Sequence, residues 1–322
     1  MTGGEILVYG GGVDNRPDLV RTLARGRLLA GNDPSVLAEA RNIKTLRTIC
    51  MEENIPFPMT WLSGEENQAG PFQGGPTESS GLLKKKALSA AGTGVSHYRG
   101  GSLPTGEYLQ EFLEGTPCSI SFIAHKQGVC VMGLSEQITG WSPLGGSGFS
   151  WNGNITPLSA AKDGSHIYQK ASRYARVLSR RFGLVGFNCV DMMLEPDGAL
   201  KVLEINPRYS GSMELLGQCL GKEPFLLHIA ASMGGTLPDV DVETASSDRC
   251  CAKGVVYAKR DCVAPDTVSW FSRGRRDIPW KGDVFSPGEP VCTVYASGRT
   301  RDTCLEALGA EAEKVYSELA GF

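Results

Sequence analysis

The sequence predicts an α+β fold with more than one domain. A chain of 322 residues exceeds the roughly 250–300 residues at which a single core stops growing. Strand patterns and helix patterns both occur, and they fall in separate runs: strand-like runs cluster in residues 81–139, after a helical region in residues 34–58. A third observation is a strong hairpin signal, with two apolar runs joined by the turn "EPDG" at residues 195–198.

The charge balance excludes a protein held to nucleic acid by phosphate contacts. The chain has 32 Lys and Arg against 35 Asp and Glu, a formal net charge of −3, and no long basic run. No stretch approaches the ~20 apolar residues that span a bilayer, and the first residues, "MTGGEILVYGG", lack the layout of a signal peptide. We therefore expect a soluble, cytoplasmic protein without nucleic-acid or membrane partners.

The ten cysteines do not form a metal-binding pattern. There is no C-x-x-C pair, and the four histidines are scattered along the sequence. A structural zinc site needs closely spaced pairs of ligands. We expect these cysteines to be mostly small buried residues in a reducing compartment.

The N-terminal part, residues 1–43, predicts only a short segment. Residues 5–9 form an apolar strand that ends in a glycine turn, Asp14 caps a helix, and Pro17 occupies the first turn of that helix. Residues 34–58 predict one or two further helices that end at two prolines. Only one strand and one helix thus precede this helical region.

The middle of the chain predicts strands after a linker. Residues 63–81 are rich in Gly, Ser and Pro, which is typical of a surface loop or a domain boundary. Strands are then expected in residues 81–88 and 107–115, and residues 118–139 predict a hairpin that turns at "HKQG".

The best helix pattern lies in residues 165–183. An apolar stripe runs along it, five lysines and arginines lie on the other side, and Gly183 ends it. We interpret the basic side as a solvated face rather than a phosphate site. Two strands follow, then a helix at 224–233, short strands from residue 253 and a final helix. Residues 246–322 therefore predict a β-rich C-terminal segment.

The end of the hairpin, "LEINPR", carries the chemistry. Side chains alternate along a strand, so Glu204, Asn206 and Arg208 project together while Leu203 and Ile205 enter the core. The hairpin can bring Asp191 of the preceding strand close to Glu204. Neighbouring carboxylates repel each other unless a cation lies between them, and oxygen ligands suit Mg²⁺. The alternative interpretation is a surface hairpin with ordinary exposed charges.

These residues carry a family resemblance. The segment "GFNCVDMML…DGALKVLEINPR" resembles the metal-binding hairpin of the ATP-grasp superfamily, in the branch of carboxylate ligases related to biotin carboxylase. The resemblance implies an ATP-grasp domain over residues 44–245, in which two α+β subdomains grip ATP behind a reduced Rossmann-like segment. It also implies ATP-binding residues in three segments, which are Lys44, Lys84, Gly92, Gly94, Glu111, Phe112 and Leu113.

The sequence departs from the family pattern at three places. The strand before the glycine loop has three consecutive lysines where the family has one, so Lys85 is an alternative to Lys84. The stretch "TPCS" after the hinge lacks the acidic residue that often holds the ribose, so no ribose contact is assigned. The N-terminal domain is shorter than in most members, and the substrate site, which rests partly on that domain, is the least defined part.

The resemblance implies ATP-dependent ligation through an acylphosphate. Lys44 and Lys84 would hold phosphates, and Asp191, Glu204 and Asn206 would hold Mg²⁺, with Mn²⁺ as an alternative ion. Arg208 would be catalytic, because it would steady the acylphosphate. The substrates would be a small-molecule carboxylate and an amine, such as glutamate joined to a cofactor precursor of the tetrahydromethanopterin or methanofuran type.

Two other functions remain open on these residues. One is a carboxylase that activates bicarbonate. The other is a nucleotide-binding subunit without activity, which pairs with an active partner or a second copy of itself. Residues 145–154, "GGSGFSWNGN", are too glycine-rich for a regular element. They predict a surface loop or a flexible wall of the substrate pocket, where Asn152 or Asn154 could make polar contacts.

Overall fold

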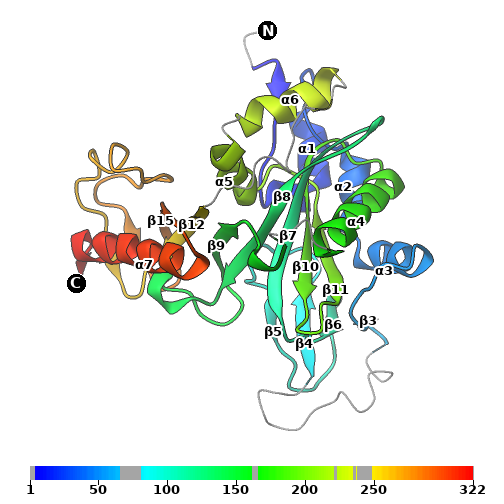
Figure 1. Cartoon of the computed structure of the whole chain (residues 1–322), viewed down its shortest axis with the longest axis horizontal. Coiled ribbons are helices and arrows are strands. Elements are labelled where there is room, and N and C mark those ends of the chain that lie inside the picture. The colour runs from blue at the N-terminus through cyan, green and yellow to red at the C-terminus, as the bar shows by residue number, and fades with distance from the viewer. Residues whose placement is uncertain are drawn as a thin grey trace.

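The fold is built around one large antiparallel sheet with a smaller sheet beside it (Figure 1). The computed structural model describes residues 4–65, 81–161, 166–220, 223–234, 237 and 249–321. Within these ranges, the predicted mixture of helices and strands is confirmed. Most of the predicted linker, and the expected domain boundary at residue 246, lie outside the described residues.

The central sheet has seven strands in the order β11-β10-β7-β8-β9-β12-β15, and every neighbouring pair is antiparallel. Its strands, in chain order, are β7 (Thr116–His125), β8 (Gly128–Thr139), β9 (Trp151–Thr156), β10 (Gly186–Leu194), β11 (Leu200–Asn206), β12 (Cys250–Tyr257) and β15 (Pro290–Gly298). The predicted turns "HKQG" and "EPDG" join β7 to β8 and β10 to β11. One face of this sheet packs against helices to form the main core.

Helix α4 (His166–Phe182) covers that face with the stripe that its sequence predicts. Ala171, Ala175 and Leu178 are fully buried, because residues three and four apart share one side of a helix. On the outer side, Arg181 forms ion pairs at 2.6 Å with Glu52 and Glu53 at the end of helix α3 (Ile43–Glu52). The basic side of α4 is thus a surface that contacts α3.

The smaller sheet has four strands in the order β3-β6-β4-β5, and it supplies one wall of the site. These strands are β3 (Thr60–Leu62), β4 (Leu82–Lys86), β5 (Val95–His97) and β6 (Glu107–Glu111). In β4, Leu82 packs into a small core with Leu103 and Leu109. Because strand side chains alternate, Leu83 and Lys85 face the other way.

A β-bulge interrupts the β10–β11 hairpin next to the predicted metal ligands. Asp191 pairs with Glu204, but Met192 pairs with Val202, so Leu203 has no partner across the ladder. The prediction that Leu203 enters the core is therefore wrong, since the extra residue turns its side chain toward a cavity. Ile205 is buried as predicted.

The N-terminal segment, which we define as residues 4–42, has one strand more than the sequence predicts. Its elements are β1 (Ile6–Leu7), the short 3₁₀ helix η1 (Val13–Asn15), α1 (Pro17–Leu23), β2 (Leu28–Leu29) and α2 (Pro34–Ala40). Strands β1 and β2 pair in parallel. Pro17 begins α1 as expected, but the prediction that Asp14 caps this helix is wrong. Arg16 occupies the cap without a side-chain bond, and Asp14 is buried.

The C-terminal part continues the central sheet, because β12 pairs with β9. Helix α7 (Arg301–Glu318) packs on β12 and β15 and begins at a capping box made by Thr300 and Thr303. The remaining elements are η3 (Ser142–Leu144), η4 (Ser159–Ala161), α5 (Gly211–Leu220), α6 (Pro224–Gly234), β13 (Cys262–Val263), β14 (Val284–Phe285) and β16 (Ala320–Gly321). No helix in the described ranges combines the length and apolar content needed to cross a lipid bilayer.

Candidate active site

A cavity of about 830 Å³ lies between the two sheets. The four-stranded sheet supplies one wall, which includes Lys85, Tyr108 and Gln110. The central sheet supplies the facing wall with Asp191 and Glu204. The cavity thus collects groups from strands that are far apart in sequence.

The two predicted metal carboxylates are neighbours in this cavity. Asp191 and Glu204 stand opposite each other on β10 and β11. The amide nitrogen Nδ2 of Asn206 donates to Asp191 Oδ2 at 2.8 Å and to Glu204 Oε1 at 3.4 Å. Burial and, next, the Glu204 carboxylate raise the pKa of Asp191. The two acidic groups therefore share one neutral hydrogen-bond donor.

This donor set fits a divalent cation. Across the described ranges, no cluster of three or more His, Cys, Asp or Glu side chains is positioned to hold a metal ion, so a third protein ligand would be of another kind, and the Asn206 amide lies next to both carboxylates. Two carboxylates and an amide oxygen are the hard ligands that Mg²⁺ accepts when phosphate oxygens and water complete its shell. A cation between the two groups would offset the repulsion by which the Glu204 carboxylate, after burial, raises the pKa of Asp191.

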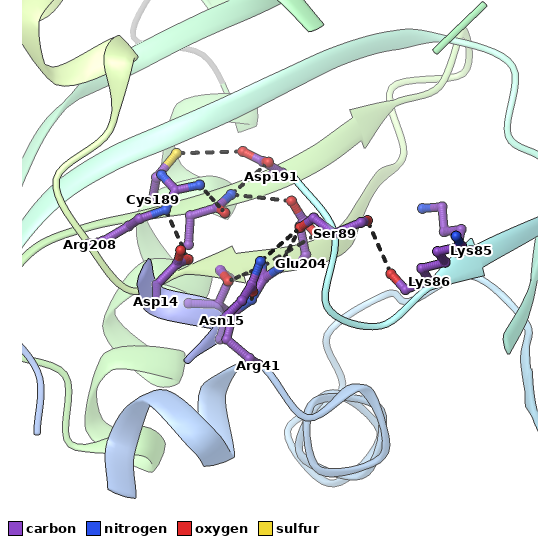
Figure 2. A network of polar contacts seen from close by, with 12 residues as sticks. Asp14, Asn15, Arg41, Lys85, Lys86, Ser89, Cys189, Asp191, Glu204 and Arg208 are labelled. Carbon is purple, nitrogen blue, oxygen red and sulfur yellow. Dashed lines mark hydrogen bonds and ion pairs between the residues drawn. The ribbon is translucent and has the colours of Figure 1, made fainter. Parts of the chain in front are cut away.

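Positive side chains surround Glu204. Burial alone would raise the pKa of its carboxyl group, but the charges of Arg41, Lys85 and Arg208 outweigh burial and lower it. Arg41 Nη1 lies 3.6 Å from Glu204 Oε2 (Figure 2). These cations would remain beside a bound triphosphate, where they could offset its charge.

Arg208 also lines the cavity and contacts Asn206, one of the predicted metal ligands. Its Nη2 donates to Asn206 Oδ1 at 3.1 Å, and its Nε donates to Asp14 Oδ2 at 2.9 Å. The first contact places the guanidinium beside the carboxylate pair, where the sequence predicts it. The second contact links it to the N-terminal segment, which sequence analysis did not connect to the site.

Of the three consecutive lysines, Lys85 faces the carboxylates. Its Nζ donates to Gln110 Oε1 at 2.7 Å. Burial lowers the pKa of this amine, although the charges of Glu204 and Asp191 act in the opposite direction. Lys84 points to the other side of β4, forms an ion pair with Glu107 at 3.5 Å, and does not line the cavity. The geometry favours Lys85, the alternative that the sequence left open, over Lys84.

Lys44 does not reach the cavity either. It lies in the first turn of α3 with its side chain exposed, and its backbone N–H donates to the side chain of the cap residue Asn42. Arg41, three residues earlier, has a side chain that is only 6% exposed and points to Glu204. Of these two cations, Arg41 is therefore the one that contacts a predicted metal ligand. The sequence signal for it was its place directly before the cap.

The glycine loop, which we define as residues 87–94 between β4 and β5, lies against the cavity. Gly92 lines the cavity and has φ +75°, and a Cβ there would lie 1.8 Å from the carbonyl oxygen of Phe149. Gly94 does not line the cavity; a Cβ there would lie 2.6 Å from Ser89 Cβ. Both positions therefore require glycine. Asn15 and Arg41 both donate to the carbonyl oxygen of Ser89, which fastens the loop to the N-terminal segment.

The predicted hinge, Glu111 to Leu113, lines the cavity at the end of β6. The N–H of Glu111 donates to Met59 and that of Phe112 donates to Gly81, at 2.8 and 2.9 Å. These two amides are thus engaged within the protein. Leu203 lines the same cavity because of the bulge, and an apolar side chain suits the face of an adenine ring.

Three further strands of the central sheet, β9, β12 and β15, also line the cavity. Contrary to the sequence prediction for residues 145–154, Trp151 to Thr156 form a regular strand, and Asn154 lines the cavity while Asn152 bonds the N–H of Trp141. Lys253, opposite Asn154 in the ladder, also lines it. Lys253 forms an ion pair with Glu214 at 2.5 Å. Sequence analysis offered Asn154 as a residue of a pocket wall, but it did not find Lys253, because no motif surrounds that residue.

Comparison with known protein families gives a match over slightly more than half of the chain. A model described as the ATP-grasp domain matches residues 43–212, a range that includes the hinge, both hairpin strands and Arg208. No curated protein sequence matches the chain closely enough to count as a relative.

Solved structures share the fold. N5-carboxyaminoimidazole ribonucleotide synthetase from Thermus thermophilus aligns with 99% of this chain and 83% of its own, with a TM-score of 0.70 at 17% identity. The biotin carboxylase domain of 2-oxoglutarate carboxylase from Hydrogenobacter thermophilus, solved with MgADP, ADP and bicarbonate, aligns over 98% and 74%, with a TM-score of 0.69 at 11% identity. At such identities the likeness shows the fold.

Proposed function

The chain belongs to the ATP-grasp family, and on that premise we propose that it is an ADP-forming ligase that activates a carboxylate with ATP and passes it to an amine. The observation that carries the proposal is the carboxylate pair with Arg208 and Lys85 in one cavity. A protein that only binds nucleotide has no chemical need for this combination. The predicted ATP and Mg²⁺ are the cofactors that this chemistry uses.

The side chains in the cavity would divide the work. Lys85 would hold phosphate oxygens, and Asp191, Glu204 and Asn206 would hold Mg²⁺. Arg41 does not line the cavity, and it would add positive charge behind Glu204. When bound, Mg²⁺ would offset the negative charge of the phosphates. Arg208 would hold the two reacting anions together, because its planar fork can bind two oxygens at once.

The reaction has two transfers. A carboxylate oxygen of the substrate attacks the γ-phosphorus, the bond to ADP breaks, and an acylphosphate forms. The amine then attacks the acyl carbon, phosphate leaves, and the amine loses a proton as the C–N bond forms. No side chain need become covalently modified in either step.

We further propose that one substrate is an amino acid such as glutamate, joined to a cofactor precursor of the tetrahydromethanopterin or methanofuran type. The support is the resemblance of the hairpin segment and the mixed charge of the cavity near β9, β12 and β15. There, Lys253 and Asp277 line the cavity, and Glu214 pairs with Lys253. A wall with both charge signs suits a substrate that carries an ammonium and a carboxylate.

A carboxylase that uses bicarbonate is the second candidate. It is favoured by the fold neighbours, because one is a synthetase of a carboxyamino compound and another was solved with bicarbonate. The first transfer would be the same, with bicarbonate in place of the larger acid.

The test is ADP release from MgATP, measured in bicarbonate-depleted buffer with a panel of amino acids and carboxylic acids, and again with bicarbonate added. Turnover that needs both an acid and an amine without bicarbonate supports the ligase, whereas turnover that needs bicarbonate supports the carboxylase. Calorimetry with and without chelator should show much weaker ATP binding without Mg²⁺. ATP binding without turnover under every condition would favour the nucleotide-binding subunit.

A further inference from the structure

Two hydrogen bonds and a close approach of Gly11 hold the guanidinium of Arg208. Its Nε donates to Asp14 at 2.9 Å, and its Nη2 donates to Asn206 at 3.1 Å. Gly11 lies against the group, and a Cβ at this glycine would lie 3.5 Å from Arg208 Cζ. Arg208 follows the end of β11, beyond the ladder that fixes Glu204 and Asn206. Its orientation therefore depends on these contacts and not on strand pairing.

Asp14 is a buried carboxylate whose ionic partner is Arg208. Its side chain is 1% exposed, and among the described residues it forms an ion pair only with Arg208. Its second oxygen, Oδ1, is buried without a hydrogen-bond partner. Burying a carboxylate with one oxygen unsatisfied costs stability, so a buried pair of this kind is weak evidence for a purely stabilising role.

The arrangement leaves the reactive edge of Arg208 available. A guanidinium has five N–H donors, and Asp14 takes the one on Nε, which leaves the four N–H groups on the two Nη atoms for other partners. Asn206 takes one on Nη2, so further N–H groups on both Nη atoms remain for a ligand in the cavity. Figure 2 shows Asp14 on the side of Arg208 that faces the N-terminal segment.

We propose that Asp14 is a positioning residue that orients Arg208 toward the phosphoryl group in transfer. The proposal rests on the proposed function, since it assigns Asp14 a role in the grip of Arg208 on the acylphosphate. It makes the N-terminal segment part of the reaction centre. In the same segment, Asn15 and Arg41 hold the glycine loop at Ser89, so one short stretch contacts both sides of the phosphate site.

The test measures binding of inorganic phosphate to the protein saturated with MgADP, which needs no knowledge of the acid or the amine. Phosphate stands for the group that Arg208 would hold after transfer. We would compare wild type, Asp14→Ala, Asp14→Asn, Arg208→Lys and the double variant Asp14→Ala/Arg208→Lys by calorimetry. Asp18→Asn is the matched control, because Asp18 is an exposed carboxylate four residues away.

Asp14→Ala is expected to weaken phosphate binding at least ~10-fold, which corresponds to about 1.4 kcal/mol, and to leave MgADP affinity unchanged. Asp14→Asn should have a smaller effect, because its amide oxygen can still accept from Nε without the charge. In the Arg208→Lys background, Asp14→Ala should add less than ~2-fold, since residues that act through one group are not additive. Asp18→Asn should resemble wild type.

Three results would overturn the proposal. Asp14→Ala could bind phosphate like the control, its effect could add fully to that of Arg208→Lys, or MgADP affinity could fall in parallel. Failure of both Asp14 variants to fold, measured by thermal melting, would show a structural role instead. If wild type binds MgADP but no phosphate, the role of Arg208 in the proposed function fails first, and the role of Asp14 fails with it.

Discussion

The β10–β11 hairpin and the N-terminal segment contribute to the same cavity in different ways. The hairpin delivers Asp191, Glu204 and Asn206 from two adjacent strands whose pairing fixes their positions. The N-terminal segment delivers Asp14 and Arg41 from short elements that meet the hairpin across more than 160 residues of chain. The first region is a local motif, whereas the second functions only through tertiary packing.

A small segment can therefore hold side chains of the site in place even though it has few elements of its own. Residues 4–42 predict too few elements for a complete domain, and their two short strands form a separate two-stranded sheet. Yet their polar side chains bond to Arg208, to the glycine loop and to the carbonyl of Ile205. The following predictions test whether substitutions in the hairpin reduce activity more than substitutions in the elements that pack against it.

The largest effect is expected in the hairpin, for Glu204→Gln. The substitution keeps the shape and removes a charge that would bind Mg²⁺, so ADP release should fall at least ~100-fold, the scale for losing one group that stabilises transition-state charge. The melting temperature should stay within a few degrees of wild type. Glu195→Gln at the turn of the same hairpin is the control and should keep its activity. If Glu204→Gln kept its activity, the Glu204 carboxylate would not take part in the reaction, and the hairpin would have only a structural role.

An intermediate effect is expected on β4, where two adjacent lysines can be compared directly. Lys85→Met should weaken MgATP binding about 10-fold, because a buried cation beside phosphates interacts strongly. Lys84→Met should change it less than ~2-fold, since its partner Glu107 forms only a partly exposed ion pair with it. Calorimetric titration of both variants checks this. If Lys84→Met weakened MgATP binding more than Lys85→Met did, β4 would present the face that carries Lys84 to the nucleotide.

The smallest effect is expected in the N-terminal segment, for Arg41→Lys. Lysine keeps the charge near Glu204 but cannot reproduce the bonds to Asn15, Ile205 and Ser89, so turnover should fall about 3-fold to 5-fold. Lys44→Ala should leave turnover unchanged, because its side chain is exposed. ADP release at saturating MgATP measures both. A larger loss of turnover in Lys44→Ala than in Arg41→Lys would mean that Lys44 of α3 contacts the phosphates.

Local periodicity carried most of the sequence prediction. The buried stripe of α4, the start of α1 at Pro17 and the pairing of Asp191 with Glu204 each depend on the spacing of residues in one element or one hairpin. Such spacing follows from the helical period of 3.6 and the strand period of 2, which hold wherever the element sits in the fold. The fold class and the family were therefore accessible from the sequence.

Tertiary structure alone decided which side of each element meets the cavity and what lies opposite. A bulge turned Leu203 out of the core, and β4 presented Lys85 instead of Lys84. Helix α3 kept Lys44 in solvent, while Arg41 contacts Glu204. Asp14, which looks like a helix cap in sequence, became the partner of Arg208, 194 residues away. Spacing within a segment cannot specify such contacts, because they depend on how separate elements pack around a shared cavity.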